Sequence, residues 1–452
     1  MARMIRHIAQ CYDSETGVII EESVLKDEEV SKAQTLKELG YLHLEQIDFL
    51  QKIQDFKIKQ QIILYTPEVC PNCGSKARKE GSFNSRFHAV LTDHAVRMQR
   101  MGCRCGWMSA SSIEGLYGSS IHPDLLEKQA LQGSNESYEK SSRSLNADSG
   151  MKRAINSHSQ IYKTVKSVGE LLEEIKSATD YGKENCVAKG VDELISNIDG
   201  GHIKSREEGR SFEAMVASVH RPESLVYVDK NHNKIESKSV VASAKDDRQE
   251  TMKLLFKQAC ISQGMTSKTT VICLADGAEN CRSIARSIEA DCSNMVYILD
   301  WFHIGMKFKN IAIPDEHKDL YNKVKWHLWH GKPETALIRL EQLKEKISED
   351  AQSEESKTLA KLDKLSIYIS NNKEGIVDYS KRKQAGLVYT SNLAETNVNS
   401  LINERQKGKQ KMLWTREGAH NILQIRAAIS SKNWKKDWSA VTNKIYKQAV
   451  CK

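Results

Sequence analysis

The stretch TTVICLADG, residues 269–277, decides the fold. It is a short apolar run bounded by turn residues, and such a run is typical of a buried β-strand. Similar runs stand on both sides of it: ELISNIDGGHI (193–203), SFEAMVASVH (211–220), SLVYVD (224–229), KIESKSVVAS (234–243) and NMVYILDWFH (294–303). The early runs follow one another, with a hairpin expected around residues 229–233, and the later ones alternate with helical patterns. We therefore predict a mixed sheet in an α/β fold.

Helical patterns occupy much of the remaining chain. Residues 1–65 are polar and helical in pattern, and residues 305–385 form a second helical region. Each region has apolar residues at helical spacing, which predicts a face that packs against other elements. The stripe positions are Leu36, Leu39, Leu42, Ile47, Leu50 and Ile53 in the first region, and Leu337, Leu340, Leu343 and Ile347 in the second.

Four cysteines have the spacing of a zinc site. Cys70 and Cys73 form a CxxC motif, Cys103 and Cys105 form a CxC motif about thirty residues later, and a glycine follows each pair. Zinc prefers four thiolates in a tetrahedron, and each pair offers two thiolates on one tight turn. We predict a zinc ribbon with a structural Zn²⁺; four reduced thiols without metal are the alternative. The other cysteines have no ligand spacing: Cys11, Cys186, Cys260, Cys273, Cys281, Cys292 and Cys451.

Residues 121–180 are predicted to form three short helices. Breaks are expected at residues 133–135 and 147–150, and the second break contains Gly150. This arrangement matches a helix-turn-helix pattern, which suits DNA binding. A three-helix packing module without nucleic acid is the alternative.

Positive charge is concentrated near the C-terminal end. The whole chain has net charge +8, whereas from Ser400 onward 12 Lys or Arg stand against 3 Asp or Glu, an excess of 9. A basic segment suits a nucleic-acid backbone, because each neutralised phosphate releases counterions; a solvated tail without a partner is the alternative. No apolar run approaches 18 residues, so we expect a cytoplasmic protein without a membrane span.

Two acids stand at the ends of predicted strands with glycine next to them. Asp199 is followed by Gly200 and Gly201, and Asp276 by Gly277. Phosphoryl transfer through two metal ions needs hard oxygen ligands of this kind, and a small neighbour lets a substrate backbone approach closely. A third carboxylate can come from a helix across the cleft. Taken singly, an Asp-Gly pair at a strand end is more often a plain turn.

Four segments together resemble the DDE transposases of bacterial insertion sequences, which have a ribonuclease-H-like core. The segments are NIDGGHI (197–203), LADGAENC (274–281), YILDWFHIGMKFKN (297–310) and SNLAETNVNSLINERQKGKQKMLWTREGAHNILQIRAA (391–428). In the matching families the first acid lies in a DGG or DGT run on the first strand, and the second in a DGA run on the fourth. A D/CxxH motif ends the next strand, and a Glu opens a late helix. The resemblance covers roughly residues 185–430.

The resemblance implies metal-binding catalytic residues at Asp199, Asp276 and Glu395, holding Mg²⁺ or Mn²⁺, with Asp300 and His303 as the supporting DxxH motif. It also implies a closing stretch that contacts DNA. The basic residues of that stretch are Arg405, Lys407, Lys409, Lys411 and Arg416, and Met412, Trp414 and Arg426 fall in the same run. The implied partners are double-stranded DNA, as element ends and as target, and at least one further copy of the chain, in a bacterial cytoplasm at the nucleoid.

Three other acids compete for these roles. Asp229 also ends an apolar run, but a hairpin turn explains it and no close glycine follows. Asp300 could bind metal directly, although a DxxH motif more readily ties the fifth strand to the next helix. Glu404 lies nine residues after Glu395, and the resemblance favours Glu395.

The predicted architecture is a ribonuclease-H-like mixed sheet with a helical insertion, preceded by a zinc ribbon and a helix-turn-helix. In chain order we expect an N-terminal helical segment (1–65), a zinc-ribbon-like domain (66–120), a helix-turn-helix-like domain (121–180), the first part of the core (185–304), a helical insertion (305–385), the final core helix (386–430) and a basic tail (431–452). The function predicted from the resemblance is DNA transposition. A catalytically inactive DNA-binding protein derived from a transposase, and a ribonuclease-H-like DNA nuclease, are the alternatives.

Overall fold

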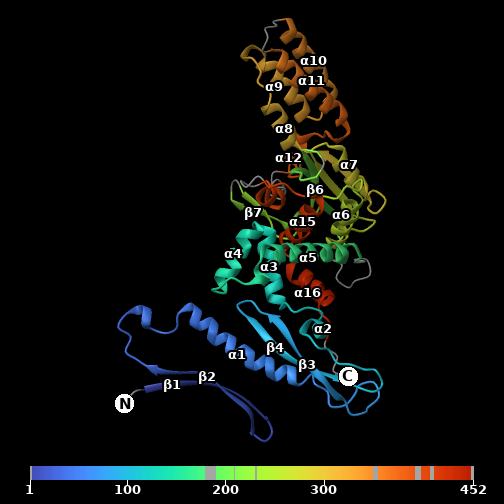
Figure 1. Ribbon diagram of the computed structural model, residues 1–452. Helices are drawn as coiled ribbons and strands as arrows, with labels where there is room; N and C mark the ends of the chain where they lie inside the picture. The colour runs from blue at the N-terminus through green and yellow to red at the C-terminus, as the bar shows by residue number, and fades with distance from the viewer. Residues whose placement is uncertain are drawn as a thin grey trace. The chain divides into compact units, whose positions relative to one another are not determined.

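The protein is described by a computed structural model (Figure 1). The structure describes residues 3–178, 190–207, 209–229, 232–349, 355–391, 399–407 and 412–448. The chain divides into two compact units, one of Met1–Val168 with Lys435–Lys452 and one of Gly169–Trp434. None of the helices described here combines the length and the apolar character that a bilayer crossing requires.

The first unit begins with a two-stranded ribbon followed by a long helix. Its elements are β1 (Arg3–Tyr12), β2 (Ile19–Val30), the short 3-10 turn Leu36–Glu38 and α1 (His43–Ile63). The ribbon closes because the Asp13 side chain accepts backbone hydrogen bonds from Glu15 (2.9 Å) and Thr16 (2.7 Å), and because Gly17 adopts φ +71°. The prediction of helix throughout residues 1–65 is therefore wrong for its first half, where turn chemistry makes an antiparallel hairpin.

The apolar stripe predicted in this region is largely exposed. Ile47 is buried, whereas five of the six positions are exposed: Leu36, Leu39, Leu42, Leu50 and Ile53. Gly40, with φ +77°, breaks the chain before α1, so the first three stripe positions do not share a helix with the others. The prediction of a packing surface is wrong for this chain taken alone.

A second hairpin and a set of helices complete the first unit. The elements are β3 (Arg78–His88), β4 (Asp93–Gly102), α2 (Ile113–Tyr117), α3 (Pro123–Asn135), α4 (Tyr138–Asp148), α5 (His158–Ala178), which continues into the second unit, and α16 (Trp434–Ile445). Three helices thus occupy the region predicted to hold three. Gly133 lets α3 approach α5, because a Cβ there would lie 2.7 Å from Val165 Cγ2.

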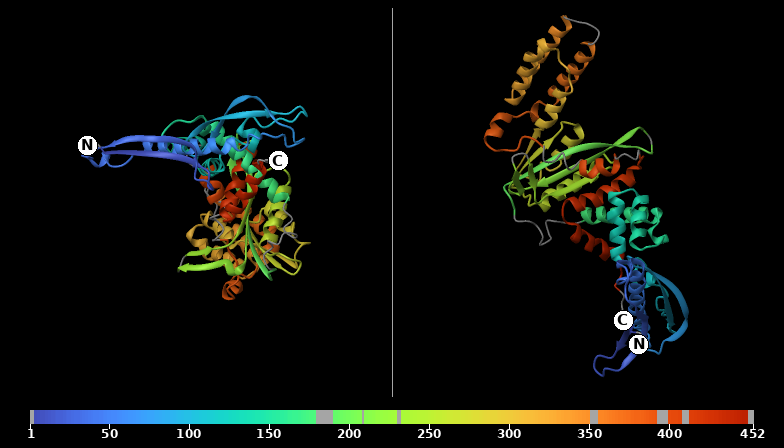
Figure 2. Two further views of the ribbon diagram at one scale, coloured as in Figure 1. Left: turned by 90° about the horizontal axis from the view of Figure 1, so that it is seen from below. Right: turned by 90° about the vertical axis from the view of Figure 1, so that its left-hand side faces the viewer.

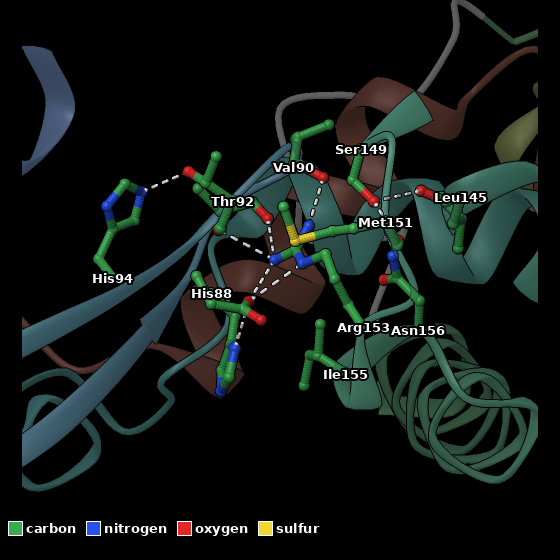
Figure 3. A network of polar contacts seen from close by, with 12 residues as sticks. His88, Val90, Thr92, His94, Leu145, Ser149, Met151, Arg153, Ile155 and Asn156 are labelled. Carbon is green, nitrogen blue, oxygen red and sulfur yellow. Dashed lines mark hydrogen bonds and ion pairs between the residues drawn. The ribbon is translucent and has the colours of Figure 1, made fainter. Parts of the chain in front are cut away.

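The Arg153 side chain ties the β3–β4 turn to the helices (Figure 3). It is 1% exposed and donates hydrogen bonds to the backbone oxygens of Val90 (2.7 Å), Ala89 (2.8 Å) and Thr92 (2.9 Å). It also pairs with Asp93. The β3–β4 hairpin and the helices therefore belong to the same compact unit.

The second unit is built on a five-stranded sheet in the order β11-β10-β5-β6-β9. Its strands are β5 (Glu193–Lys204), β6 (Ser211–His220), β9 (Ser239–Ser243), β10 (Thr270–Ala275) and β11 (Asn294–Leu299). β10 is parallel to both β5 and β11, whereas β6 is antiparallel to both β5 and β9. This confirms the predicted mixed α/β sheet. The predicted hairpin is also present, as β7 (Leu225–Asp229) and β8 (His232–Ile235), in a separate two-stranded sheet.

Helices cover both faces of the sheet, because successive strand residues point to opposite sides. On β10, Val271 and Cys273 pack with α6 (Glu250–Ser262) and α7 (Glu279–Arg286). Ile272 and Leu274 pack with the opposite cluster, formed by the helices that follow β11. Those helices are α8 (Trp301–Lys309), α9 (Lys318–Trp329), α10 (Pro333–Glu349), α11 (Glu355–Asn371) and α12 (Tyr379–Gln384).

The predicted helical region is present as α9, α10 and α11, which lie side by side in Figure 1 and in the right-hand view of Figure 2. Its predicted stripe is confirmed, since Leu340, Leu343 and Ile347 are buried and Leu337 packs against them. On the other edge of the sheet, α15 (Arg416–Ser430) runs along β9.

Candidate functional site

The strand register brings two of the predicted acids together. Ala275 on β10 pairs with Ile198 on β5, so Asp276 and Asp199 follow on neighbouring parallel strands. Such strands are about 4.8 Å apart. On the other side of β10, Ala275 pairs with Leu299, which places Asp300 next in the row.

The Asp199 and Asp276 side chains are each partly buried and held by a backbone N–H group. Asp199 Oδ1 accepts a hydrogen bond from Gly200 N (2.7 Å), and Asp276 Oδ1 accepts one from Ala278 N (2.8 Å). The Tyr368 hydroxyl of α11 donates to the backbone oxygen of Asp276 (2.8 Å). A helix of the insertion thus fixes the end of the strand that carries the second acid.

The glycines beside the two acids make room for this chain's own side chains. A Cβ on Gly200 would lie 2.6 Å from Glu213 Oε1. Gly277 has φ +90°, and a Cβ there would lie 2.6 Å from Asn372 Oδ1. Gly277 is thus favoured by its turn conformation and by the Asn372 side chain, whereas Gly200 leaves room for the Glu213 side chain.

Electrostatic surroundings disfavour the charged form of Asp199. Burial raises its pKa above the usual value, and the nearby carboxylates of Asp276 and Asp300 act in the same direction. His303 and the N–H of Gly200 oppose the shift. A cation placed here would relieve this repulsion.

Asp300 has a structural position at the end of β11. It is fully buried, begins α8 by accepting a hydrogen bond from Phe302 N (3.1 Å), and accepts both the N–H (2.9 Å) and the hydroxyl of Ser391. His303 Nε2 lies 3.6 Å from Asp300 Oδ2. The carboxylate thus links the end of β11, the start of α8 and Ser391.

The three remaining acids have different outcomes. Glu395 lies outside the residues that the structure describes, four residues after Ser391 in the chain. The competing Asp229 is on β7, which does not belong to the five-stranded sheet. Glu404 forms an ion pair with the buried Arg426 (3.0 Å), which explains its charge without a metal.

Glu213 is an acid of the site that the sequence analysis missed. It lies on β6 beside Gly200 and accepts a hydrogen bond from Asn280 Nδ2 (2.6 Å) at the start of α7. The signal was available, since Glu213 is the one charged residue before His220 in the run SFEAMVASVH, and the residues from 214 to 220 are buried.

The closing stretch is partly built into the fold. Arg405 is buried, stacks on the Trp414 ring (4.8 Å to the centroid) and lies 3.6 Å from Met412 Sδ, so its guanidinium is used internally, against the prediction of DNA contact. Arg416 is half-exposed and pairs with Asp246 (3.5 Å). Of the other predicted DNA contacts, Lys407 is exposed, whereas Lys409 and Lys411 lie outside the described residues.

The four predicted zinc ligands gather in the first unit. Their four sulfur atoms all lie within 4.8 Å of one another, as the ligands of one metal ion would. The sulfur pairs Cys70–Cys105 and Cys73–Cys103 are 3.6 and 3.5 Å apart, close to the spacing of about 3.8 Å that Zn–S bonds of about 2.3 Å give in a tetrahedron.

Two matching turns bring these thiols together. Gly74 N donates to Cys70 O (2.9 Å) and Gly106 N to Cys103 O (3.0 Å), and both glycines have positive φ. Hydrogen bonds from the side chain and backbone of Ser75 lower the pKa of Cys73 to about 6, which favours the thiolate that binds metal. The cluster fits one structural zinc ion.

Comparison with known proteins places the chain in a family. No curated protein matches the sequence. A family model described as Uncharacterised protein family (UPF0236) matches residues 119–442, which is well over half of the 452-residue chain and includes the whole second-unit sheet. The protein therefore belongs to the UPF0236 family.

Proposed function

We propose that this protein is a DNA transposase that binds element ends and uses Asp199, Asp276 and Glu395 to cut and rejoin DNA phosphodiesters with divalent metal ions. The observation that carries the proposal is the adjacency of β5 and β10, the first and fourth strands of the sheet in chain order. The resemblance to DDE transposases requires acids on the first and fourth strands to meet, and the register supports this for Asp199 and Asp276.

The fifth strand adds support. The resemblance expects a DxxH motif at its end, and β11 is followed directly by Asp300 and His303. Ser391, four residues before Glu395 in the chain, bonds to Asp300 through its N–H and its hydroxyl. The strand arrangement and these contacts agree with a row of acidic residues at the strand ends of a ribonuclease-H-like core. We include this core in the proposal.

The donor set suits Mg²⁺ or Mn²⁺, because all proposed ligands are carboxylate oxygens and the pKa of Asp199 is raised where a cation would offset the charge. Divalent ions held there would activate the attacking hydroxyl and stabilise the leaving oxygen. The chain contributes rigid placement, since Tyr368 and the N–H of Ala278 hold Asp276. Glu213 and Asn280 fix the neighbouring turn.

The reaction consists of two balanced steps. In the first, water attacks the phosphorus at an element end, the bond to the 3′ oxygen breaks, and a 3′ hydroxyl and a 5′ phosphate result. In the second, that 3′ hydroxyl attacks a target phosphodiester, so one phosphorus–oxygen bond forms as another breaks. The basic C-terminal region, with Lys407 exposed, and the helices α3 to α5 are the proposed DNA-contacting parts.

The test joins pre-cut duplexes, carrying the terminal sequences of the DNA that flanks the gene, to a supercoiled plasmid in Mg²⁺. We expect Asp199→Asn, Asp276→Asn and Glu395→Gln each to reduce joining at least about 1,000-fold while DNA binding in a mobility-shift assay stays intact. Asp229→Asn is the matched control, because it makes the same change on a strand outside the sheet.

Three outcomes would contradict the proposal. Full joining by any of the three site variants would remove that residue from the site. Cutting without joining by the wild-type protein would indicate a nuclease on the same core. Binding without either reaction, with no inverted repeats flanking the gene, would indicate a DNA-binding protein derived from a transposase.

A further inference from the structure

The β1–β2 ribbon has an inner and an outer face. The inner face lies against α1, where Leu25 is buried and the His7 ring lies 4.8 Å from that of Phe49. The outer face consists of five cross-strand pairs. These are Met4–Glu29, Arg6–Asp27, Ile8–Val24, Gln10–Glu22 and Tyr12–Ile19.

The outer face combines exposed apolar side chains with two polar pairs whose members bond to each other, and with Glu29 opposite Met4. Its apolar side chains are between 45% and 61% exposed: Met4, Ile8, Tyr12, Ile19 and Val24. Between them, Arg6 Nε donates to Asp27 Oδ2 (3.0 Å) and Gln10 Nε2 to Glu22 Oε2 (2.6 Å). Covering this face with protein would bury apolar surface without stripping hydrogen bonds from the polar pairs.

The charge of this region favours a protein partner over a nucleic acid. Residues 1–64 contain 8 Lys or Arg and 11 Asp or Glu, a net charge of −3 in a chain whose total is +8. β2 carries five acids and one Lys, whereas β1 carries two Arg and no acid. A phosphate backbone would be repelled by β2, and the face therefore fits a protein.

The two strands complement each other in charge, and this selects the partner. We propose that the outer face of the ribbon binds the same face of a second copy of this chain. A two-fold axis parallel to the strands, midway between two facing ribbons, sets β1 of each copy over β2 of the other at the same level. Arg6 then faces Asp27 of the second copy, and Ile8 faces Val24 of the second copy. Such a contact is isologous and closes as a dimer.

This interface rests on the proposed function, because it is the surface through which two transposase copies would associate. Dimerisation can nevertheless be measured without DNA. Failure of DNA joining therefore leaves it standing, and failure of dimerisation leaves the catalytic proposal to its own test. A two-stranded ribbon is marginally stable by itself, and a partner that covers its exposed apolar face buries surface that stabilises it.

The experiment uses the full chain in sedimentation velocity from 1 to 50 µM. We expect the wild type to sediment as a dimer of about 102 kDa, twice 51.1 kDa. Arg6→Asp and Asp27→Arg, each alone, should weaken dimerisation at least about tenfold, because each puts like charges opposite one another twice by symmetry. An equimolar mixture of the two variants should recover dimers, since the Arg6→Asp copy then faces the Asp27→Arg copy.

Two further variants separate the interface from folding and general charge. Ile8→Lys should weaken dimerisation by a similar factor with an unchanged circular dichroism spectrum. Lys52→Asp on the exposed side of α1 is the matched charge control and should dimerise as the wild type does. A monomer of 51.1 kDa throughout the range, or single variants that dimerise like the wild type, would overturn the proposal. A mixture that does not recover dimers would overturn the facing of β1 and β2.

Discussion

Replacing Arg153 with alanine tests whether the β3–β4 hairpin and the helices of the first unit fold together. The side chain is 1% exposed and satisfies three backbone oxygens of the β3–β4 turn as well as the Asp93 carboxylate. Each backbone oxygen left without its charged donor costs about 1 kcal/mol, after allowance for water that enters. The ion pair is discounted to about 1 kcal/mol, because the Asp93 side chain is 38% exposed and solvent screens it.

Together these losses amount to about 4 kcal/mol. For a unit of this size, that lowers the Tm by roughly 8–16 °C. The assay is thermal unfolding of the full chain followed by circular dichroism. Arg143→Ala is the control, because its ion pair with Glu139 is exposed on both sides and should change the Tm by about 2 °C or less. A loss below 1 kcal/mol for Arg153→Ala would refute the reasoning.

The same network predicts a pH dependence with a definite sign. Burial alone would raise the pKa of Asp93, but hydrogen bonds from His88 and Arg153 outweigh it and hold the pKa well below the usual range. A carboxylate with a depressed folded pKa contributes stability that is present above its unfolded pKa, about 3.9, and is lost as pH falls toward the folded value. The Tm difference between wild type and Arg153→Ala should therefore shrink below about pH 4.

Two predictions concern metal ions. Purified protein should contain one zinc ion per chain, and Cys70→Ser should lose both the zinc and the folding of the β3–β4 hairpin. Cys11→Ser, outside the cluster, should keep both. Equal zinc content in all three proteins would contradict the zinc site. In a chelator, Asp199→Asn should raise the Tm at neutral pH, because a carboxylate with a raised folded pKa loses stability as pH rises through that pKa. The wild type alone should gain about 1.4 kcal/mol from 10 mM Mg²⁺ if the Kd is about 1 mM, and an equal gain in the variant would exclude Asp199 as a ligand.

Local patterns in the sequence predicted the elements that depend on local physics. The strands around Asp199 and Asp276 were recognisable because apolar runs of strand length end at turn residues, and the stripe through Leu340 and Leu343 because its helical spacing matches a buried face. The four cysteines were recognisable because tight turns fix ligand spacing along the chain.

Where the sequence analysis failed, a non-local contact or a turn decided the outcome. The Asp13 turn and Gly17 replaced helix with hairpin at the N-terminus. The resemblance implied a DNA contact for Arg405, but this side chain is buried and stacks on Trp414 inside the fold. Glu213 was missed because its place beside Gly200 depends on the pairing of β6 with β5.

The sequence by itself determined the acids at strand ends, the thiols on tight turns and the class of fold, since these follow from periodicity and turn chemistry within short segments. Only the tertiary structure decided which acids become neighbours. Strand order and register brought Asp276 beside Asp199 and left Asp229 in a separate hairpin. The tertiary structure also placed Asp300 where it accepts a hydrogen bond from Ser391 N. These choices depend on pairing between segments far apart in the chain, which no local pattern of residues encodes.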